Sequence, residues 1–85
     1  MTIKLLFFAG LREAVGSASE ALALPPGVAD VAAVRAHLAA RGGVWAEHFA
    51  VTRNLRAAVN QDMAGPAAAV RAGDEVAFFP PVTGG

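Results

Sequence analysis

The sequence contains no cysteine among its 85 residues. Disulfide bonds, a thiolate nucleophile and a thiolate metal site are therefore excluded. Its only histidines are His37 and His48, and two such residues without a third ligand do not indicate a metal site. Any covalent chemistry at this chain must use a group other than a thiol.

Charge of one sign and long hydrophobic runs are also missing. Seven basic and seven acidic residues cancel, and the arginines are scattered, so no basic stripe is available to neutralise a phosphate backbone. No apolar run approaches the roughly 20 residues that span a bilayer. Because the first residues lead directly into a strand-like run, no signal peptide is indicated. The sequence predicts a cytoplasmic protein with neither a nucleic-acid nor a membrane partner.

The length and the hydrophobic content indicate one folded domain. A chain of 85 residues is below the usual domain size, so residues 1–85 are expected to form a single compact unit without a second module. Hydrophobic residues make up 55% of the chain, which is more than disordered proteins contain. We find no internal repeat and no linker.

Hydrophobic patterning predicts four strands and one main helix. The strands are expected at residues 2–9, 20–24, 55–59 and 76–79. A helical turn is expected at 11–15, where Gly16 suits a left-handed C-terminal position, and another short turn at 44–49. Asp30 is placed to cap the main helix, in which Val31, Val34 and Leu38 recur at helical spacing. That helix is expected to end at Arg41, a cation for its negative end, followed by Gly42-Gly43.

This order of elements predicts an α+β protein with the β-grasp fold. A single helix can bury its apolar stripe only by lying across one face of a mixed sheet. The first and last strands are the two most apolar runs, so they are expected side by side at the centre of that sheet. The strand at 20–24 is expected to pair with the first strand as a hairpin.

Beyond Phe79 the chain is expected to leave the sheet as a tail over residues 80–85. Its sequence is Pro80-Pro81-Val82-Thr83-Gly84-Gly85, and at about 3.3–3.6 Å per residue it reaches roughly 20 Å. The prolines stiffen the base and the glycines remove side-chain bulk at the tip, so a narrow channel can admit it. A frayed terminus without function is the alternative on these residues alone.

The ending Asp74-Glu75-Val76-Ala77-Phe78-Phe79-Pro80-Pro81-Val82-Thr83-Gly84-Gly85 resembles the C-terminal signature of the small subunits of molybdopterin synthase, the ubiquitin-like MoaD family of sulfur carriers. Further matches are Leu6-Phe7-Phe8-Ala9, Leu11-Arg12-Glu13 with Gly16, and Ala57-Ala58-Val59-Asn60. The resemblance covers the whole chain, and the Phe-Phe-Pro-Pro-Val run before Gly-Gly is its most specific part. The stretch 62–70 matches nothing distinctive and is assigned no role.

The resemblance implies a carrier cycle at the carboxylate of Gly85. An adenylating enzyme related to ubiquitin-activating enzymes uses ATP to form an acyl-adenylate, and a sulfur donor such as a cysteine desulfurase or rhodanese converts it to a thiocarboxylate. The thiocarboxylate then gives its sulfur to cyclic pyranopterin monophosphate within the synthase, where the large subunit carries the catalytic residues. No cofactor is expected to bind the chain stably, and the implied assembly has two small subunits flanking a dimer of large ones.

Docking on these partners requires a surface beside the tail. If Ile3, Leu5 and Phe7 face the helix, the strand period of two turns Leu6 and Phe8 to the open face, and Phe79 follows on the last strand. These three residues are predicted to form an exposed apolar patch that binds partners. The alternative is that the rest of a small two-sided core covers them.

Arg12, with Glu13, is predicted to make a charged contact at the edge of this interface. The alternative is a solvated pair worth under roughly 1 kcal/mol. Trp45 is expected to close the helix end of the core.

Three other functions remain open at this point. They are a thiamin-type sulfur carrier of the same fold, a ubiquitin-like modifier that forms isopeptide bonds with lysines, and an interaction module whose tail carries no chemistry.

Overall fold

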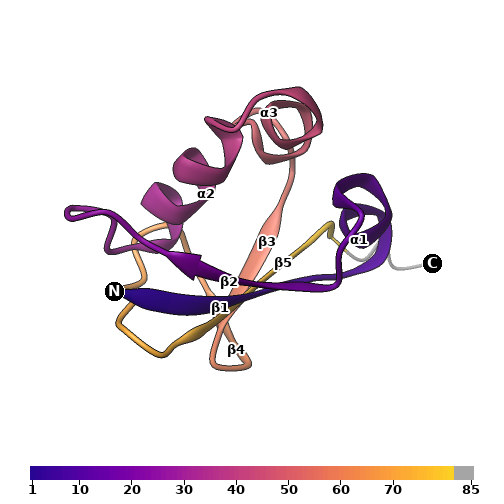
Figure 1. Ribbon diagram of the computed structural model, residues 1–85. Helices are drawn as coiled ribbons and strands as arrows, with labels where there is room; N and C mark the ends of the chain where they lie inside the picture. Colours follow the sequence, from indigo (N-terminus) through magenta and orange to yellow (C-terminus); the bar gives the residue numbers. More distant parts are fainter. Residues whose placement is uncertain (82–85) are drawn as a thin grey trace.

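The computed structural model describes residues 1–81, which form a five-stranded mixed sheet with helices over one face and one end (Figure 1). The elements in chain order are β1 (Thr2–Phe7), α1 (Ala9–Val15), β2 (Ser19–Ala23), α2 (Val31–Ala39), α3 (Gly43–Phe49), β3 (Arg56–Val59), β4 (Asp62–Ala64) and β5 (Glu75–Phe79). The strand order is β2-β1-β5-β3-β4. The α+β class and the β-grasp arrangement are therefore confirmed.

The two most apolar strands lie side by side at the centre, as predicted. β1 pairs with β5 in parallel, with Leu6 beside Ala77 and Phe7 beside Phe78. β2 pairs antiparallel with β1, so the predicted hairpin pairing of residues 20–24 is also confirmed. β3 pairs antiparallel with β5 on the other side. Each of the two central strands thus has a neighbouring strand on both edges. The tail begins where β5 ends, at Phe79.

The main helix begins where the sequence predicts. The Asp30 carboxylate Oδ1 accepts a hydrogen bond of 2.7 Å from the backbone N–H of Ala33, which satisfies one of the free donors in the first turn of α2. Gly16 likewise ends α1 in the left-handed conformation, with φ of 78°.

Arg41 does not act as predicted at the C-terminus of the main helix. α2 ends at Ala39, and the basic residue in its last turn is His37. The Arg41 guanidinium instead reaches across to the Glu20 carboxylate on β2, as described below. The planar guanidinium makes two parallel hydrogen bonds to the carboxylate and also packs on the Trp45 ring, which explains the choice of partner.

The core lies between the sheet and the helices. Ile3, Leu5 and Phe7 alternate inward from β1 and are almost completely buried, as their spacing predicts. An aromatic cluster packs at the α3 end, where the Phe7 ring lies 5.6 Å from Trp45 and 6.1 Å from Phe49 in edge-to-face contacts. Trp45 is partly buried against this core, so its predicted packing role is confirmed.

Three elements differ from the sequence-based expectation. The first strand ends at Phe7 rather than at residue 9, because Phe8 is the N-cap of α1 and Ala9 has a positive φ of 53°. Residues 44–49 belong to a seven-residue helix, α3, that begins at Gly43.

The third difference is β4, which the sequence did not indicate. Asn60 and Gln61 both have positive φ, 50° and 71°, and form a two-residue turn that folds Asp62 back opposite Val59. The Asn60 amide also binds β5: its Nδ2 donates to the Asp74 carboxylate and its Oδ1 accepts from the Glu75 N–H, each at 3.0 Å. The hairpin end is thereby tied to the start of the last strand.

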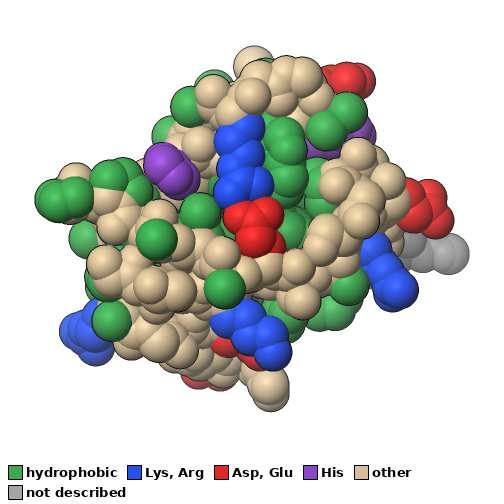
Figure 2. Space-filling view, in the orientation of Figure 1, with side chains coloured by type: hydrophobic (Ala, Val, Ile, Leu, Met, Phe, Trp, Pro, Cys, Tyr) green, Lys and Arg blue, Asp and Glu red, His purple; other side chains and the backbone are tan. Residues whose placement is uncertain are grey.

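Charge is dispersed over the surface. On the face seen in Figure 2, basic and acidic side chains lie among apolar and neutral groups without forming a stripe of one sign. None of the helices in the described part of the chain has the length and hydropathy that crossing a membrane requires.

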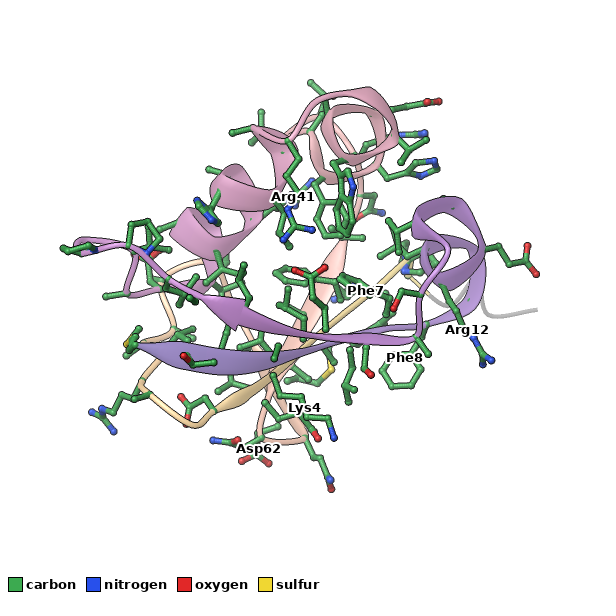
Figure 3. The ribbon with its side chains drawn as sticks, in the orientation of Figure 1. Lys4, Phe7, Phe8, Arg12, Arg41 and Asp62 are labelled. Carbon is green, nitrogen blue, oxygen red and sulfur yellow. The ribbon has the colours of Figure 1, made fainter. Side chains whose placement is uncertain are left out.

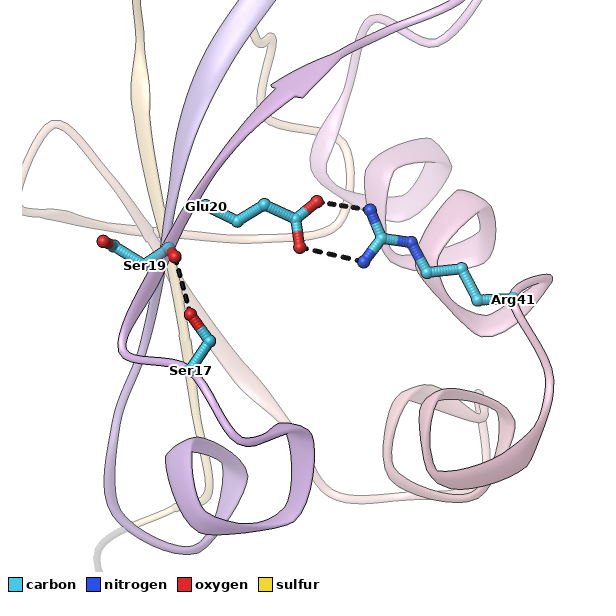
Figure 4. Close-up of polar contacts among 4 residues, drawn as sticks. All are labelled: Ser17, Ser19, Glu20 and Arg41. Carbon is cyan, nitrogen blue, oxygen red and sulfur yellow. Dashed lines mark hydrogen bonds and ion pairs between the residues drawn. The ribbon is translucent and has the colours of Figure 1, made fainter.

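An ion pair joins the edge strand β2 to the segment after α2 (Figure 4). Arg41 Nη1 donates to Glu20 Oε1 at 3.0 Å, Nη2 donates to Oε2, and the guanidinium carbon lies 4.4 Å from the centre of the Trp45 ring. The hydrogen bonds from Arg41 hold the pKa of Glu20 below its ordinary value of 4.5. This pair stabilises the fold above that pH.

We expect Glu20→Gln to lower the free energy of unfolding by up to ~1 kcal/mol at pH 7, since the pair is partly exposed. A carboxyl whose pKa is lower in the folded state stabilises above its unfolded value, and that contribution is lost as the pH falls through the folded value. The difference between wild type and variant should therefore shrink as the pH falls below 4.5 and disappear once the pH is below the folded pKa of Glu20. Urea unfolding at pH 7 and at a pH well below 4.5 measures this difference in stability. Glu13→Gln, at an exposed position of α1, is the control. An equal difference at both pH values would contradict the role of the charged pair.

Candidate functional site

The root of the tail lies at the end of β5, beside α1. Pro80 and Pro81 follow the last strand residue, Phe79, and they stand outside the sheet as predicted. They line a cavity of about 390 Å³ together with residues of α1, the end of α3 and the loop before β3. The predicted tail residues Val82, Thr83, Gly84 and Gly85 lie outside the described residues.

The open face of the sheet, opposite α2 and α3, carries an apolar row across its middle. Leu6 on β1 lies beside Ala77 on β5, Ala77 lies opposite Ala58 on β3, and Ala58 lies opposite Met63 on β4. The two alanines are covered, Leu6 is half-buried and Met63 is 64% exposed. Small residues in the middle of the row leave a shallow apolar surface rather than a ridge.

The aromatic pair Phe8 and Phe79 stands at the tail end of this face. The two ring centroids are 6.5 Å apart at an interplanar angle of 79°, an edge-to-face contact. Figure 3 shows Phe8 on the side of the sheet away from the helices, whereas Phe7 points toward them. The structure thus brings the predicted patch residues Leu6, Phe8 and Phe79 to one face. Their binding of partners remains a prediction.

Exposure within this patch is uneven. Phe8 is 49% exposed, while Leu6 and Phe79 are half-buried. The alternative of a fully covered patch does not hold for Phe8, and a partner would meet its ring first. Phe79 supports that ring from the strand that leads into the tail.

Arg12 lies beside the patch. Its side chain extends from α1 on the same side of the sheet as Phe8 in Figure 3, and it is exposed. Within the described chain, no carboxylate lies within salt-bridge distance of Arg12, so the Arg12–Glu13 pair is not an ion pair there. The guanidinium is available to a partner, and this role stays a prediction.

The titratable groups of residues 1–81 whose pKa is shifted are engaged in structural contacts rather than gathered into a site. The pKa of Asp74 is lowered by the backbone N–H of Arg71 and by the Asn60 amide, both of which hold the turn into β5. No group of three or more potential metal ligands occurs in that part of the chain. The described residues therefore offer a partly exposed apolar face and a tail root, not an acid–base constellation.

Comparison with known proteins identifies the family. The model of the ThiS family matches residues 5–85, which include the apolar patch of Leu6, Phe8 and Phe79 and the whole tail. The chain belongs to the ThiS family. Two curated relatives are each called molybdopterin synthase sulfur carrier subunit. The Escherichia coli protein is 49% identical and the Haemophilus influenzae protein 45% identical, each over 84 residues that cover 98% of this chain and 99% of the relative.

Solved structures of similar fold include another ubiquitin-like protein. The small archaeal modifier protein SAMP1 of Haloferax volcanii superposes with a TM-score of 0.78 and 28% identity, over the full length of both chains. This superposition supports the β-grasp assignment for the ThiS-family chain. The family and the fold predicted from the sequence are both confirmed.

Sequence reasoning missed one charged residue near the aromatic pair. Arg56, the first residue of β3, lies opposite Phe79 in the β3–β5 register. The available signal was the strand period, because two positions before Ala58 is again an open-face position. Without the register of β3 against β5, that position could not be placed beside the tail.

Proposed function

We propose that this chain is the sulfur-carrier subunit of molybdopterin synthase. The observation that carries the proposal is its identity of 45–49% over nearly the full length with two proteins of that name. The family match extends over residues 5–85 and therefore includes the terminal Gly84-Gly85 of this chain. The described fold supplies what such a carrier requires, which is a rigid body that presents a stiffened tail root beside an apolar face.

The first step activates the Gly85 carboxylate. A carboxylate is a poor electrophile, so an adenylating partner joins it to the α-phosphate of ATP, giving an acyl-adenylate and releasing pyrophosphate. A persulfide on a sulfur-donor protein then attacks the acyl carbon and AMP leaves. Reductive cleavage of the resulting acyl disulfide by a thiol leaves the thiocarboxylate on Gly85.

The second step delivers the sulfur. The tail enters the large subunit of the synthase, and the terminal sulfur, a better nucleophile than the oxygen it replaced, attacks cyclic pyranopterin monophosphate. Hydrolysis of the thioester link returns the Gly85 carboxylate and leaves sulfur on the pterin. Two such deliveries complete one dithiolene.

The geometry of the described residues suits this division of labour. Because the reacting group belongs to the last residue, catalytic acids and bases are needed where the tail arrives, on the large subunit. The six residues from Pro80 onward reach roughly 20 Å when extended, which is enough to enter a buried site while the domain stays outside. Phe8 and Phe79 then form the apolar contact at the channel mouth.

A reconstituted reaction tests the proposed function. Thiocarboxylated chain, mixed with the large subunit of the synthase and cyclic pyranopterin monophosphate, is expected to yield molybdopterin with two carriers consumed per product. The unloaded chain, with its ordinary carboxylate, is the matched control and should yield none. Sulfur transfer to a thiazole precursor instead, with no molybdopterin, would assign the chain to thiamin synthesis and overturn the proposal.

A second candidate function is protein modification. It is favoured by the similarity to SAMP1, a small archaeal modifier protein. The same acyl-adenylate could be captured by a lysine amine to give an isopeptide bond. Incubation of the chain with its activating enzyme, ATP and cell lysate separates the two functions, because stable adducts of higher mass are expected only for a modifier.

A further inference from the structure

Arg56 extends the aromatic pair into a row of three across the tail end of the sheet. It lies opposite Phe79 in the antiparallel β3–β5 pair, and directly opposed residues project from the same face about 5 Å apart. Phe79 itself contacts Phe8 on the open face. The order across the sheet is therefore Phe8, Phe79, Arg56.

The Arg56 side chain is exposed, and its charge is not used within the described fold. No carboxylate of residues 1–81 lies within salt-bridge distance of it, and no hydrogen bond from its guanidinium occurs there. Arg35, Arg41 and Arg53, by contrast, are tied to backbone carbonyls or carboxylates. Arg56 thus contributes no ion pair to these residues, and its charge faces solvent.

The charges on the open face differ along the strands. Away from the tail, Lys4 lies beside Glu75 in the β1–β5 register, so a basic and an acidic residue are neighbours there. In Figure 3, Lys4 and Asp62 lie below the middle of the sheet, whereas Phe8 and Arg12 lie toward the end where the tail begins. Arginines thus flank the aromatic pair on both sides, whereas a basic and an acidic residue, Lys4 and Glu75, are paired farther from the tail.

We propose that Arg56 is a specificity-determining docking residue that pairs with a carboxylate of the synthase large subunit, at the mouth of the channel that receives the tail. This inference rests on the proposed function and names the chemistry of the partner's surface. Arg56 lies opposite the residue that precedes Pro80, so whatever contacts it stands beside the entering tail. Charge complementarity there favours the orientation of the partner that places its acidic group beside the tail.

The test measures the affinity of the large subunit for Arg56→Gln, which keeps most of the side-chain stem and removes the charge. We expect the Kd to rise about tenfold at low salt, as when one member of a partly desolvated charge pair is lost. The increase should shrink at high salt, where screening weakens the wild-type pair. Arg56→Lys keeps the charge but lacks the planar guanidinium, so its Kd should fall between those of the wild type and Arg56→Gln.

The matched control is Arg71→Gln. Arg71 is also an exposed arginine outside any ion pair of residues 1–81, but it precedes the turn into β5 at the far end of the sheet. Arg71→Gln changes the net charge by the same amount as Arg56→Gln, and its Kd should stay within about twofold of wild type. Equal weakening by both variants would reduce the effect to net charge and overturn the inference.

Two further readouts separate this inference from the proposed function. Circular dichroism and urea unfolding establish that the variants are folded. Thiocarboxylate formation by the activating enzyme is expected to proceed at the wild-type rate in Arg56→Gln. Normal loading with unchanged Kd overturns only the role of Arg56, and slowed loading with unchanged Kd assigns the residue to the activating enzyme instead. Failure of the wild type to load overturns the proposed function.

Discussion

A chain with one alanine added after Gly85 is expected to lose sulfur loading and molybdopterin synthesis by at least about a hundredfold. The extension moves the terminal carboxylate one residue beyond the position that the adenylating site is built to hold, and a misplacement of even 1 Å can cost that much. It also puts a side chain after Gly84-Gly85, where this chain has none. Intact-mass measurement of the thiocarboxylate and assay of the pterin product follow the loss.

The control inserts the same alanine in the exposed turn at Pro26-Gly27, far along the chain from the tail. That variant should load and transfer sulfur normally. If the chain extended after Gly85 supported full cofactor synthesis, the terminal carboxylate would not be the working group, and an interaction module without tail chemistry would be the better description.

Phe7→Ala is expected to lower the free energy of unfolding by about 3–5 kcal/mol, the usual cost of emptying a large buried aromatic site. Phe7 is 1% exposed and contacts Trp45 and Phe49 edge to face. Small domains have only about 5–15 kcal/mol in total, so the variant should be partly unfolded at physiological temperature. Urea or thermal unfolding followed by circular dichroism measures the change.

The adjacent residue is the matched control. Phe8 is the same side chain one position later, but it lies on the open face and is 49% exposed. Phe8→Ala should change stability by less than about 1 kcal/mol and should instead weaken binding of the large subunit. Equal destabilisation at both positions would contradict the assignment of the two faces.

The spacing of hydrophobic residues and the position of a helix-capping residue made most of the fold predictable. The alternation of Ile3, Leu5 and Phe7 identifies a strand with one buried face, and Asp30 ahead of a helical pattern identifies the start of α2. The pairing of the first and last strands followed from their both being strongly apolar, since such runs need neighbours on both edges. These signals depend only on neighbouring residues or on hydrophobic content, so they can be recognised in the sequence without the structure.

Interactions that depend on register or on distant partners could not be predicted. β4 has three residues and pairs through a tight turn at Asn60, too short for any period to be visible. Arg41 follows α2 in sequence and was assigned to the helix end, yet its partner Glu20 is 21 residues away on another element. The place of Arg56 likewise required the register of β3 against β5.

For the candidate site, too, one part could be predicted from residue spacing and another could not. Strand alternation predicted that Leu6, Phe8 and Phe79 share a face, and the structure brings them together beside the tail root. The chemistry assigned to Gly85 came from the resemblance of the whole ending to a family and not from any pattern of titratable groups. A terminal carboxylate has no spacing or environment in the sequence that could mark it as reactive.

The most direct test of the carrier chemistry is the intact mass of the chain after incubation with its activating enzyme, ATP and a sulfur donor. Replacement of one carboxylate oxygen by sulfur adds about 16 mass units. We predict this gain for the wild type and its absence when Gly85 is deleted. An unchanged wild-type mass, under conditions that load another carrier of the family, would contradict the account.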